Sequence, residues 1–192
     1  MAAIDRLKKK NEPQVSIALL RMKPSPMTTT QMGKSSDTGE DVAEGGTHPA
    51  GTEPAPKGTL AGGLQDLLNN VSAYYITAHQ FHWNVTGPDF AEFHEFFGEV
   101  YEDAWNSLDP IAENIRKLNV MVDMEFGQPD ECNGVSEMLK CLSDMNSSLI
   151  KQLKDLIDVA DKEREQGILN FLADRLDTHQ KYQWQLTSFM SR

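Results

Sequence analysis

Apolar side chains recur at intervals of three and four residues through most of the chain after Gly63. This spacing gathers them on one face of an α-helix, whereas a strand would show strict alternation. The pattern predicts four long helices, which run from about Leu64 to Val85, from near Asp89 to about Leu118, from Val135 to Ala160 and from near Glu163 to Met190. Four amphipathic helices with no strand pattern predict an all-α four-helix bundle over residues 64–192.

The chain before this bundle has a different composition. Residues 24–63 are rich in Gly, Pro, Ser and Thr and contain almost no large apolar side chain. Because burial cannot offset the entropy of ordering such a segment, it is predicted to be a flexible linker. Residues 1–23 form a basic arm in front of it, so the bundle carries a long flexible N-terminal extension. The arm's candidate contacts are Arg6, Lys8, Lys9, Lys10, Arg21 and Lys23.

Charge separates this arm from the rest of the protein. The whole chain has a net charge of −11, which argues against phosphate binding by the acidic body. The basic arm could hold duplex DNA through salt-sensitive phosphate contacts without reading the bases. Two alternatives remain open, because the acidic linker could fold back on the arm, or the arm could be a docking peptide for another protein.

Neither a membrane anchor nor a disulfide framework is expected. No apolar run approaches the ~20 residues of a membrane span, and the N-terminus lacks the apolar segment of a secretory signal. A soluble cytoplasmic protein with no membrane partner is the simplest expectation, associated with the nucleoid if it binds DNA. Cys132 and Cys141 are nine residues apart, which fits neither a CxxC metal site nor a secreted framework. Buried thiols in a reducing compartment explain both.

Histidine is concentrated in one short stretch, since residues 79–97 hold three of the five histidines. His82 is near the end of the first predicted helix and His94 near the start of the second, so a tight turn would bring both imidazoles to one end of the bundle. Farther along the second helix, Asp109 and Glu113 share a face. The helix rises roughly 22 Å between His94 and Asp109. The two pairs are therefore either unrelated or meet across a symmetric interface.

Other interpretations compete with a metal site. The sequence contains no Glu-x-x-His pair, so a conventional di-iron site inside the bundle is not expected. A histidine next to a tryptophan on an apolar helix often fills a core, and two carboxylates four residues apart often form a solvated face. His79 is more readily explained as a solvent-facing or hydrogen-bonded side chain than as a ligand.

Three motifs resemble the signature of the Dps mini-ferritins, the DNA-protection-during-starvation family. They are HWNVTGPDF from His82 to Phe90, His94 with Glu95, and DPIAEN from Asp109 to Asn114. The stretch from Asp174 to Trp184 is similar to the last helix of that family. The resemblance covers roughly residues 60–190 and implies a ferritin-like bundle assembled into a hollow homododecamer. It also implies that iron(II) is oxidised, preferably by hydrogen peroxide, and that ferric iron (Fe3+) is stored inside.

The resemblance also assigns roles to individual residues. His82 and His94 would be imidazole ligands of iron, while Asp109 and Glu113 would supply carboxylates from a two-fold-related subunit, and these four would form the catalytic ferroxidase site. Such a mixed nitrogen and oxygen set suits iron(II) better than calcium or magnesium. Gly98 stands where the family commonly places an acidic ligand, which weakens the expected ferroxidase activity.

Two other classes of function stay open beside this ferroxidase. One is a catalytically weak shell that coats DNA or tethers itself to another assembly through the basic arm. The other is a structural oligomer that binds neither iron nor DNA.

Overall fold

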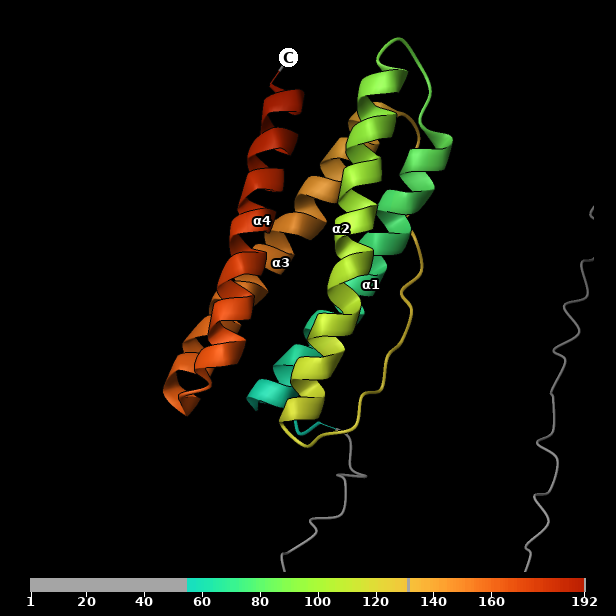
Figure 1. The fold of residues 1–192 in the computed structure, drawn as a ribbon. Coiled ribbons are helices and arrows are strands. Elements are labelled where there is room, and N and C mark those ends of the chain that lie inside the picture. The colour runs from blue at the N-terminus through green and yellow to red at the C-terminus, as the bar shows by residue number, and fades with distance from the viewer. Residues whose placement is uncertain (1–54, 131, 192) are drawn as a thin grey trace, which may run out of the picture. The chain divides into compact units, whose positions relative to one another are not determined.

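The computed structural model describes residues 55–130 and 132–191. These residues form four helices and no strand, which confirms the predicted all-α four-helix bundle (Figure 1). The helices are α1 (Leu60–Asn84), α2 (Phe90–Lys117), α3 (Val135–Glu163) and α4 (Gln166–Met190). Helices α1 and α2 form one packed pair, α3 and α4 form another, and α1 also packs on α3.

Some predictions fall outside this region. The basic arm over residues 1–23 and all but the end of the linker predicted over residues 24–63 lie outside the described residues. None of the described helices combines the length and the apolar character that a membrane span requires. Helix α2 continues through Pro110 without a break.

Helix α1 begins at Leu60, four residues before the start that the apolar pattern predicts. The Thr59 hydroxyl caps this end by accepting a hydrogen bond from the Gly62 amide at 3.1 Å. A Cβ atom at Gly62 would lie 2.3 Å from the Pro56 carbonyl oxygen, so only glycine lets the incoming chain approach this closely. The last residues of the predicted linker are therefore the first turn of the helix.

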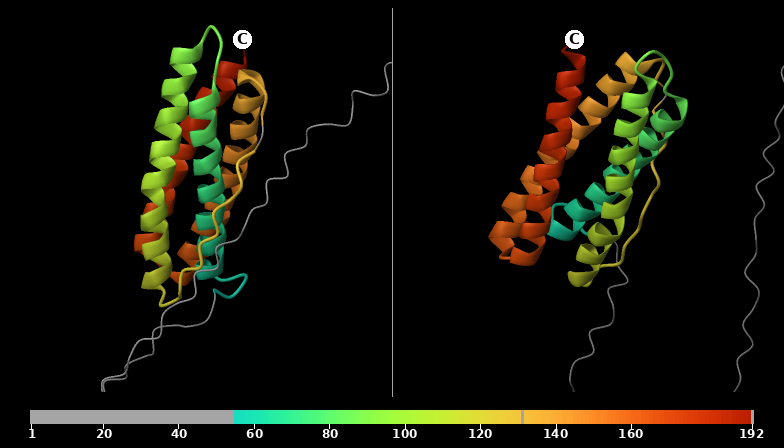
Figure 2. Two further views of the ribbon diagram at one scale, coloured as in Figure 1. Left: turned by 90° about the vertical axis from the view of Figure 1, so that its right-hand side faces the viewer. Right: turned by 45° about the horizontal axis from the view of Figure 1, so that its top comes forward.

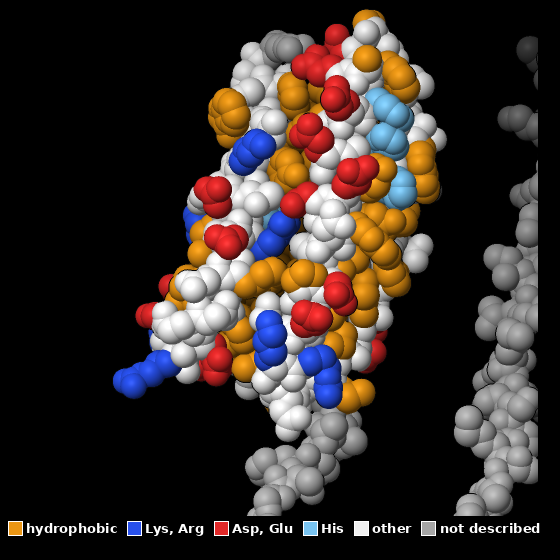
Figure 3. Space-filling model, viewed as in Figure 1, with side chains coloured by type: hydrophobic (Ala, Val, Ile, Leu, Met, Phe, Trp, Pro, Cys, Tyr) orange, Lys and Arg blue, Asp and Glu red, His pale blue; other side chains and the backbone are white. Residues whose placement is uncertain are grey.

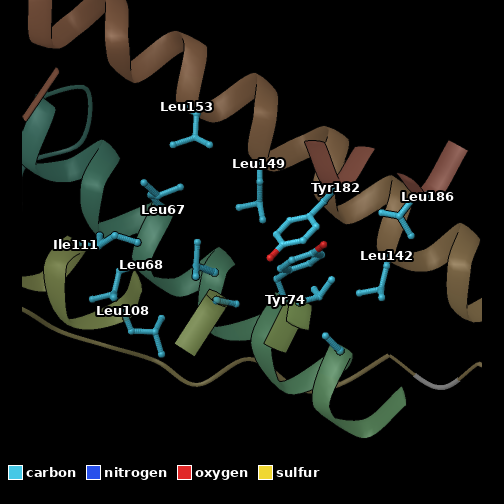
Figure 4. Packing of buried hydrophobic residues seen from close by; sticks show 14 of the residues in the cluster. Leu67, Leu68, Tyr74, Leu108, Ile111, Leu142, Leu149, Leu153, Tyr182 and Leu186 are labelled. Atoms are coloured by element: carbon cyan, nitrogen blue, oxygen red, sulfur yellow. The ribbon is translucent and has the colours of Figure 1, made fainter. Parts of the chain in front are cut away.

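The core consists mainly of leucine and aromatic side chains from all four helices. Figure 4 shows leucines of several helices around Tyr74 and Tyr182. Both tyrosines are buried, and the Tyr182 hydroxyl donates to the Glu99 carbonyl oxygen at 3.4 Å. Burial of large apolar side chains on this scale is the dominant force that holds such a bundle together.

A buried polar network crosses the bundle between α2, α3 and α4. Arg175 donates two hydrogen bonds to the Asp103 carboxylate, at 2.9 and 2.6 Å. His179 lies one turn farther along α4 and is buried, and its Nδ1 lies 2.7 Å from Asn146 Oδ1 on α3. Asn146 in turn donates to the His179 carbonyl oxygen and to Gln183 Oε1. These contacts fix how the two helix pairs face each other, because each buried polar group needs its partner.

Residues 118–134 connect α2 to α3, and within this connector residues 120–130 follow α1 in an extended conformation (Figure 2, left). Polar side chains of α1 hold this connector along its length. Gln65 accepts from the Asp123 amide at 3.0 Å, and Ser72 donates to the Glu125 carbonyl oxygen at 2.9 Å. Gly127 lies directly against α1, where an added Cβ atom would come within 2.4 Å of the Ala73 Cβ atom.

Candidate metal centre

A short turn between α1 and α2 brings the first two candidate ligands together. The Val85 amide closes α1 by donating to the Phe81 carbonyl oxygen at 2.9 Å. Gly87 then adopts a φ of +116°, a left-handed conformation that disfavours side chains, and its carbonyl oxygen accepts from the Phe90 amide at 3.2 Å. The chain therefore reverses within five residues, and the last turn of α1 lies beside the first turns of α2.

His82 and His94 are joined by two reciprocal hydrogen bonds. His82 Nδ1 lies 2.7 Å from the His94 carbonyl oxygen, and His94 Nδ1 lies 2.8 Å from the His82 carbonyl oxygen. The two rings are stacked, with centroids 3.7 Å apart and an angle of 23° between their planes. Both side chains are half-buried, so part of each stays accessible to solvent.

These bonds determine which ring nitrogen is available to a metal. A carbonyl oxygen can only accept a hydrogen bond, so each Nδ1 must carry the proton. In the neutral ring this assignment leaves the lone pair on Nε2, which is the form of imidazole that binds metal ions. Backbone partners also fix the ring orientation, as outer hydrogen bonds do for histidine ligands in general. The sequence predicted that the two imidazoles share one end of the bundle, and the structure places them there.

Gly98 lies directly beside this pair. A Cβ atom built at this position would be 3.4 Å from His82 Nδ1 and 3.5 Å from His82 Cε1, which are ordinary van der Waals distances. The backbone at Gly98 is helical, so a side chain would fit without strain. An acidic side chain there would stand next to the imidazole pair, and glycine leaves that position without a donor.

His79 belongs to a cluster of aromatic side chains one turn before His82. Its Nδ1 lies 3.2 Å from the Tyr75 hydroxyl oxygen, and its ring stacks on Tyr101 with centroids 3.9 Å apart. Trp83 also packs against this ring, with centroids 4.0 Å apart and an angle of 40° between the planes. Desolvation, followed by the proximity of His82, lowers the pKa of His79. This agrees with the interpretation of His79 as a hydrogen-bonded side chain.

Asp109 and Glu113 are both exposed and lie four residues apart on α2. Asp109 lines a surface cavity of about 640 Å³, to which the connector contributes Met124 and Phe126 and α2 contributes Trp105 and Pro110. Both carboxylates are therefore accessible, and one of them borders an apolar hollow.

The histidine pair and the carboxylate pair do not meet within one chain. They are separated by roughly 22 Å along α2, and in residues 55–130 and 132–191 no three His, Cys, Asp or Glu side chains come together as a metal site. Figure 3 shows histidine side chains in a row next to hydrophobic ones along the edge that α1 and α2 form. Large aromatic side chains are exposed near both pairs, with Trp83 64%, Trp105 53% and Phe126 61% accessible.

Sequence reasoning missed two groups of polar residues. His179 had no evident partner, yet burial, followed by the Arg175 charge, lowers the pKa of its ring to about 4. The cysteines were expected to be buried, whereas both are half-buried, and the Cys141 thiol donates a hydrogen bond to Asp130 of the connector. The hydrogen bonds of His179 to Asn146 and of Cys141 to Asp130 have no signal in local spacing, because each joins two different elements of the fold.

Comparisons with known proteins agree with this fold. The family model described as Ferritin-like domain matches residues 61–192, which is more than half of the chain. The DNA protection during starvation protein of Brevibacillus brevis is 29% identical over 137 residues, covering 66% of this chain and 91% of that protein. General stress protein 20U of Bacillus subtilis is 25% identical over 130 residues, covering 63% and 90%.

Solved structures give the same picture. The DPS protein of Vibrio cholerae O1, described as a member of a broad superfamily of ferritin-like diiron-carboxylate proteins, superposes with a TM-score of 0.64 at 26% identity. The match covers 68% of this chain and 88% of that chain. A Dps protein from Bacillus brevis also has a TM-score of 0.64 at 26% identity, with 68% and 94% covered.

Proposed function

Because this chain is a Dps-family member of the ferritin-like proteins, we propose that it binds iron(II), oxidises it and stores the ferric product in a homo-oligomeric shell. The reciprocal hydrogen bonds between His82 and His94 are the observation that carries this proposal. They leave the lone pair of each ring on Nε2, so the two stacked rings offer two nitrogen donors at an accessible position on the subunit.

The donor set fits iron as the substrate. Two imidazole nitrogens with two carboxylates form a mixed set that accommodates iron(II), whereas magnesium and calcium prefer oxygen alone. The histidines supply the nitrogens in a fixed orientation, and Asp109 and Glu113 supply negative charge that favours the ferric over the ferrous ion. Because Gly98 has no carboxylate, we expect iron to bind more weakly here than at a site with an additional acidic ligand at this position.

A two-fold axis would complete the site. In an isologous pair, His82 and His94 of one protomer would face Asp109 and Glu113 of its partner, and the same contact would repeat on the other side. Exposed Trp83, Trp105 and Phe126 surround the two half-sites, and large aromatic side chains are favoured in subunit interfaces. Such a pair is the building block for the dodecamer that the Dps resemblance implies.

Hydrogen peroxide is the oxidant that the resemblance favours. One peroxide accepts two electrons, so two iron(II) ions and two protons are consumed and two water molecules form. Because both electrons reach the same peroxide, hydroxyl radical is not released. The protein's part is to hold iron(II) at the shared site and to limit encounters between free iron and peroxide.

Stopped-flow oxidation of iron(II) by peroxide tests the enzyme claim. The double variant His82→Ala, His94→Ala is expected to lose most of the wild-type rate, because it removes both nitrogen donors. His79→Ala is the matched control, since this histidine lies one turn away and bonds Tyr75 instead. Equal initial rates in wild type and the double variant would remove the ferroxidase from the account.

We also propose that the basic arm binds duplex DNA directly. The relative from Brevibacillus brevis is named a DNA protection during starvation protein, which supports this second role. Lys8, Lys9 and Lys10 provide three adjacent positive charges. A full-length variant with all three lysines changed to Gln is expected to release duplex DNA at lower salt than the wild type. Identical gel shifts across the salt series would assign the arm to another partner.

A further inference from the structure

The two cysteines of the chain lie together at the end of the connector. Cys132 lies in the connector just before α3, and Cys141 lies in the second turn of that helix. Both are half-buried and both pack against the hydrophobic core, so small oxidants can reach them while bulk solvent is partly excluded. The sequence contains no other cysteine.

Asp130 completes this group. The Cys141 thiol donates a hydrogen bond to Asp130 Oδ2 at 3.3 Å. Burial, together with hydrogen bonds to Asp130 and to the Cys132 thiol, raises the pKa of Cys141. Cys141 is therefore held as a protonated thiol, with its proton directed at a carboxylate. A second hydrogen bond, from the Asp130 amide to the Thr77 hydroxyl at 3.3 Å, anchors this part of the connector to α1.

We propose that Cys132 and Cys141 are a peroxide-sensitive thiol pair that closes an intramolecular disulfide between the connector and α3. The hydrogen bond from the Cys141 thiol to Asp130, which lies two residues before Cys132, and the partial exposure of both thiols carry the inference. It concerns a different place on the subunit from the histidine pair and does not depend on iron.

The chemistry balances in two steps. The Cys132 thiolate attacks one oxygen of hydrogen peroxide, the O–O bond breaks, and the leaving hydroxide takes a proton to become water, which leaves a sulfenic acid on Cys132. The Cys141 sulfur then attacks the Cys132 sulfur while its proton passes to Asp130. The S–S bond forms, the S–O bond breaks, and the leaving hydroxide takes that proton from Asp130 to become a second water. Two thiols have lost two hydrogens, and peroxide has gained two electrons.

A disulfide at this place would act on the connector. Residues 118–134 are held to α1 by side-chain hydrogen bonds, and their end would become covalently fixed to α3 as well. The same connector contributes Met124 and Phe126 to the cavity beside Asp109. Oxidation would therefore make the segment that borders one half-site less able to detach from the bundle.

Thiol counting on metal-free, full-length protein tests the proposal. Peroxide is added in the presence of a chelator, and free thiols and intact mass are followed with time. We expect both thiols to disappear, the mass of the chain to fall by two hydrogens, and a dithiol reductant to restore both. Persistence of the thiols, a covalent dimer, or sulfinic acid as the main product would each overturn the pair.

Three variants separate the roles of the residues. In Cys141→Ser, a sulfenic acid on Cys132 should accumulate and react with a dimedone-type reagent, whereas in Cys132→Ser the Cys141 thiol should survive the same exposure. The opposite pattern would contradict the order of attack. Asp130→Asn should slow disulfide closure by roughly tenfold or more while leaving the first step unchanged. An unchanged closure rate would remove Asp130 from the mechanism.

Discussion

His82 and His94 each bond the backbone carbonyl of the other through Nδ1, at 2.7 and 2.8 Å, and their rings stack with centroids 3.7 Å apart. This relationship makes the pair one preorganised unit instead of two independent side chains. Backbone carbonyl oxygens hold both rings in the same tautomer. These acceptors do not ionise, so they stay in place when the pH or the salt concentration changes. Metal binding at such a pair needs little rearrangement of the protein, which reduces its entropic cost.

Gly98→Asp should strengthen iron binding. The new Cβ atom would make ordinary contact with the His82 ring at 3.4 Å, and the carboxylate would add an oxygen donor next to the two nitrogens. We expect iron(II) affinity to rise by about tenfold, within the range that single changes around a metal site produce. Isothermal titration under anaerobic conditions measures this change.

Gly98→Ala is the control for that substitution. It removes the flexibility of glycine inside α2 without adding a donor, so thermal unfolding should show a gain of roughly 0.5–1 kcal/mol and iron affinity should stay at the wild-type value. If the alanine variant gained as much affinity as the aspartate variant, the effect would come from helix rigidity and not from a ligand.

The bundle should become less stable as the pH falls, because His179 takes up a proton more readily in the unfolded chain. Its pKa is lowered to about 4 in the folded chain from 6.5, because burial and the Arg175 charge disfavour the protonated ring. The unfolded chain therefore binds the proton first, and stability present above pH 6.5 is lost as the pH falls towards 4. The shift corresponds to about 3 kcal/mol. Urea unfolding between pH 7 and pH 4 measures it.

His179→Gln isolates this contribution from the carboxylates that titrate in the same range. Glutamine can still donate to Asn146 but cannot take up a proton. The variant should be less stable than the wild type at pH 7, and the difference between the two should shrink as the pH falls. A difference that stays constant over this range would show that His179 is not the titrating group.

Gly127→Ala should detach the connector from α1. The added Cβ atom would lie 2.4 Å from the Ala73 Cβ atom and 2.7 Å from the Ala73 Cα atom, a backbone position that cannot move aside. The expected cost is about 1–3 kcal/mol, as for other overpacked sites. Hydrogen exchange should rise in residues 118–134 while the four helices keep their protection.

Gly167→Ala provides the matched control on α4, because nothing lies within 4 Å of the position of its Cβ atom. Its stability should be unchanged or raised by up to about 1 kcal/mol. Exchange in residues 118–134 should not respond to it. An equal increase in both variants would show that the connector responds to general destabilisation and not to its contact with Ala73.

The parts of this fold that sequence alone could predict are those with a local cause. Apolar periodicity predicted four helices, and the ends of α2 and α4 agree with the pattern within a few residues. The turn around Gly87 also made it possible to predict that His82 and His94 share one end of the bundle. In each case the decisive interactions are between residues close in sequence or on one helix face.

Features with distant partners could not be predicted in this way. The early start of α1 depends on Thr59 and on the fit of Gly62 against Pro56. His179 lies within hydrogen-bond distance of Asn146 on α3, and the Cys141 thiol bonds Asp130 of the connector. These relationships follow from tertiary packing, and no period or motif in one sequence records them.

Subunit complementation tests the central claim, that two chains share each iron site. One double variant carries His82→Ala and His94→Ala, and the other carries Asp109→Ala and Glu113→Ala. Each is expected to be inactive when assembled alone. When the two are unfolded together and reassembled, mixed two-fold pairs contain one site with both histidines and both carboxylates intact. Random mixing predicts recovery of about a quarter of the wild-type rate of iron(II) oxidation. No recovery in verified mixed assemblies would contradict a site built from two subunits.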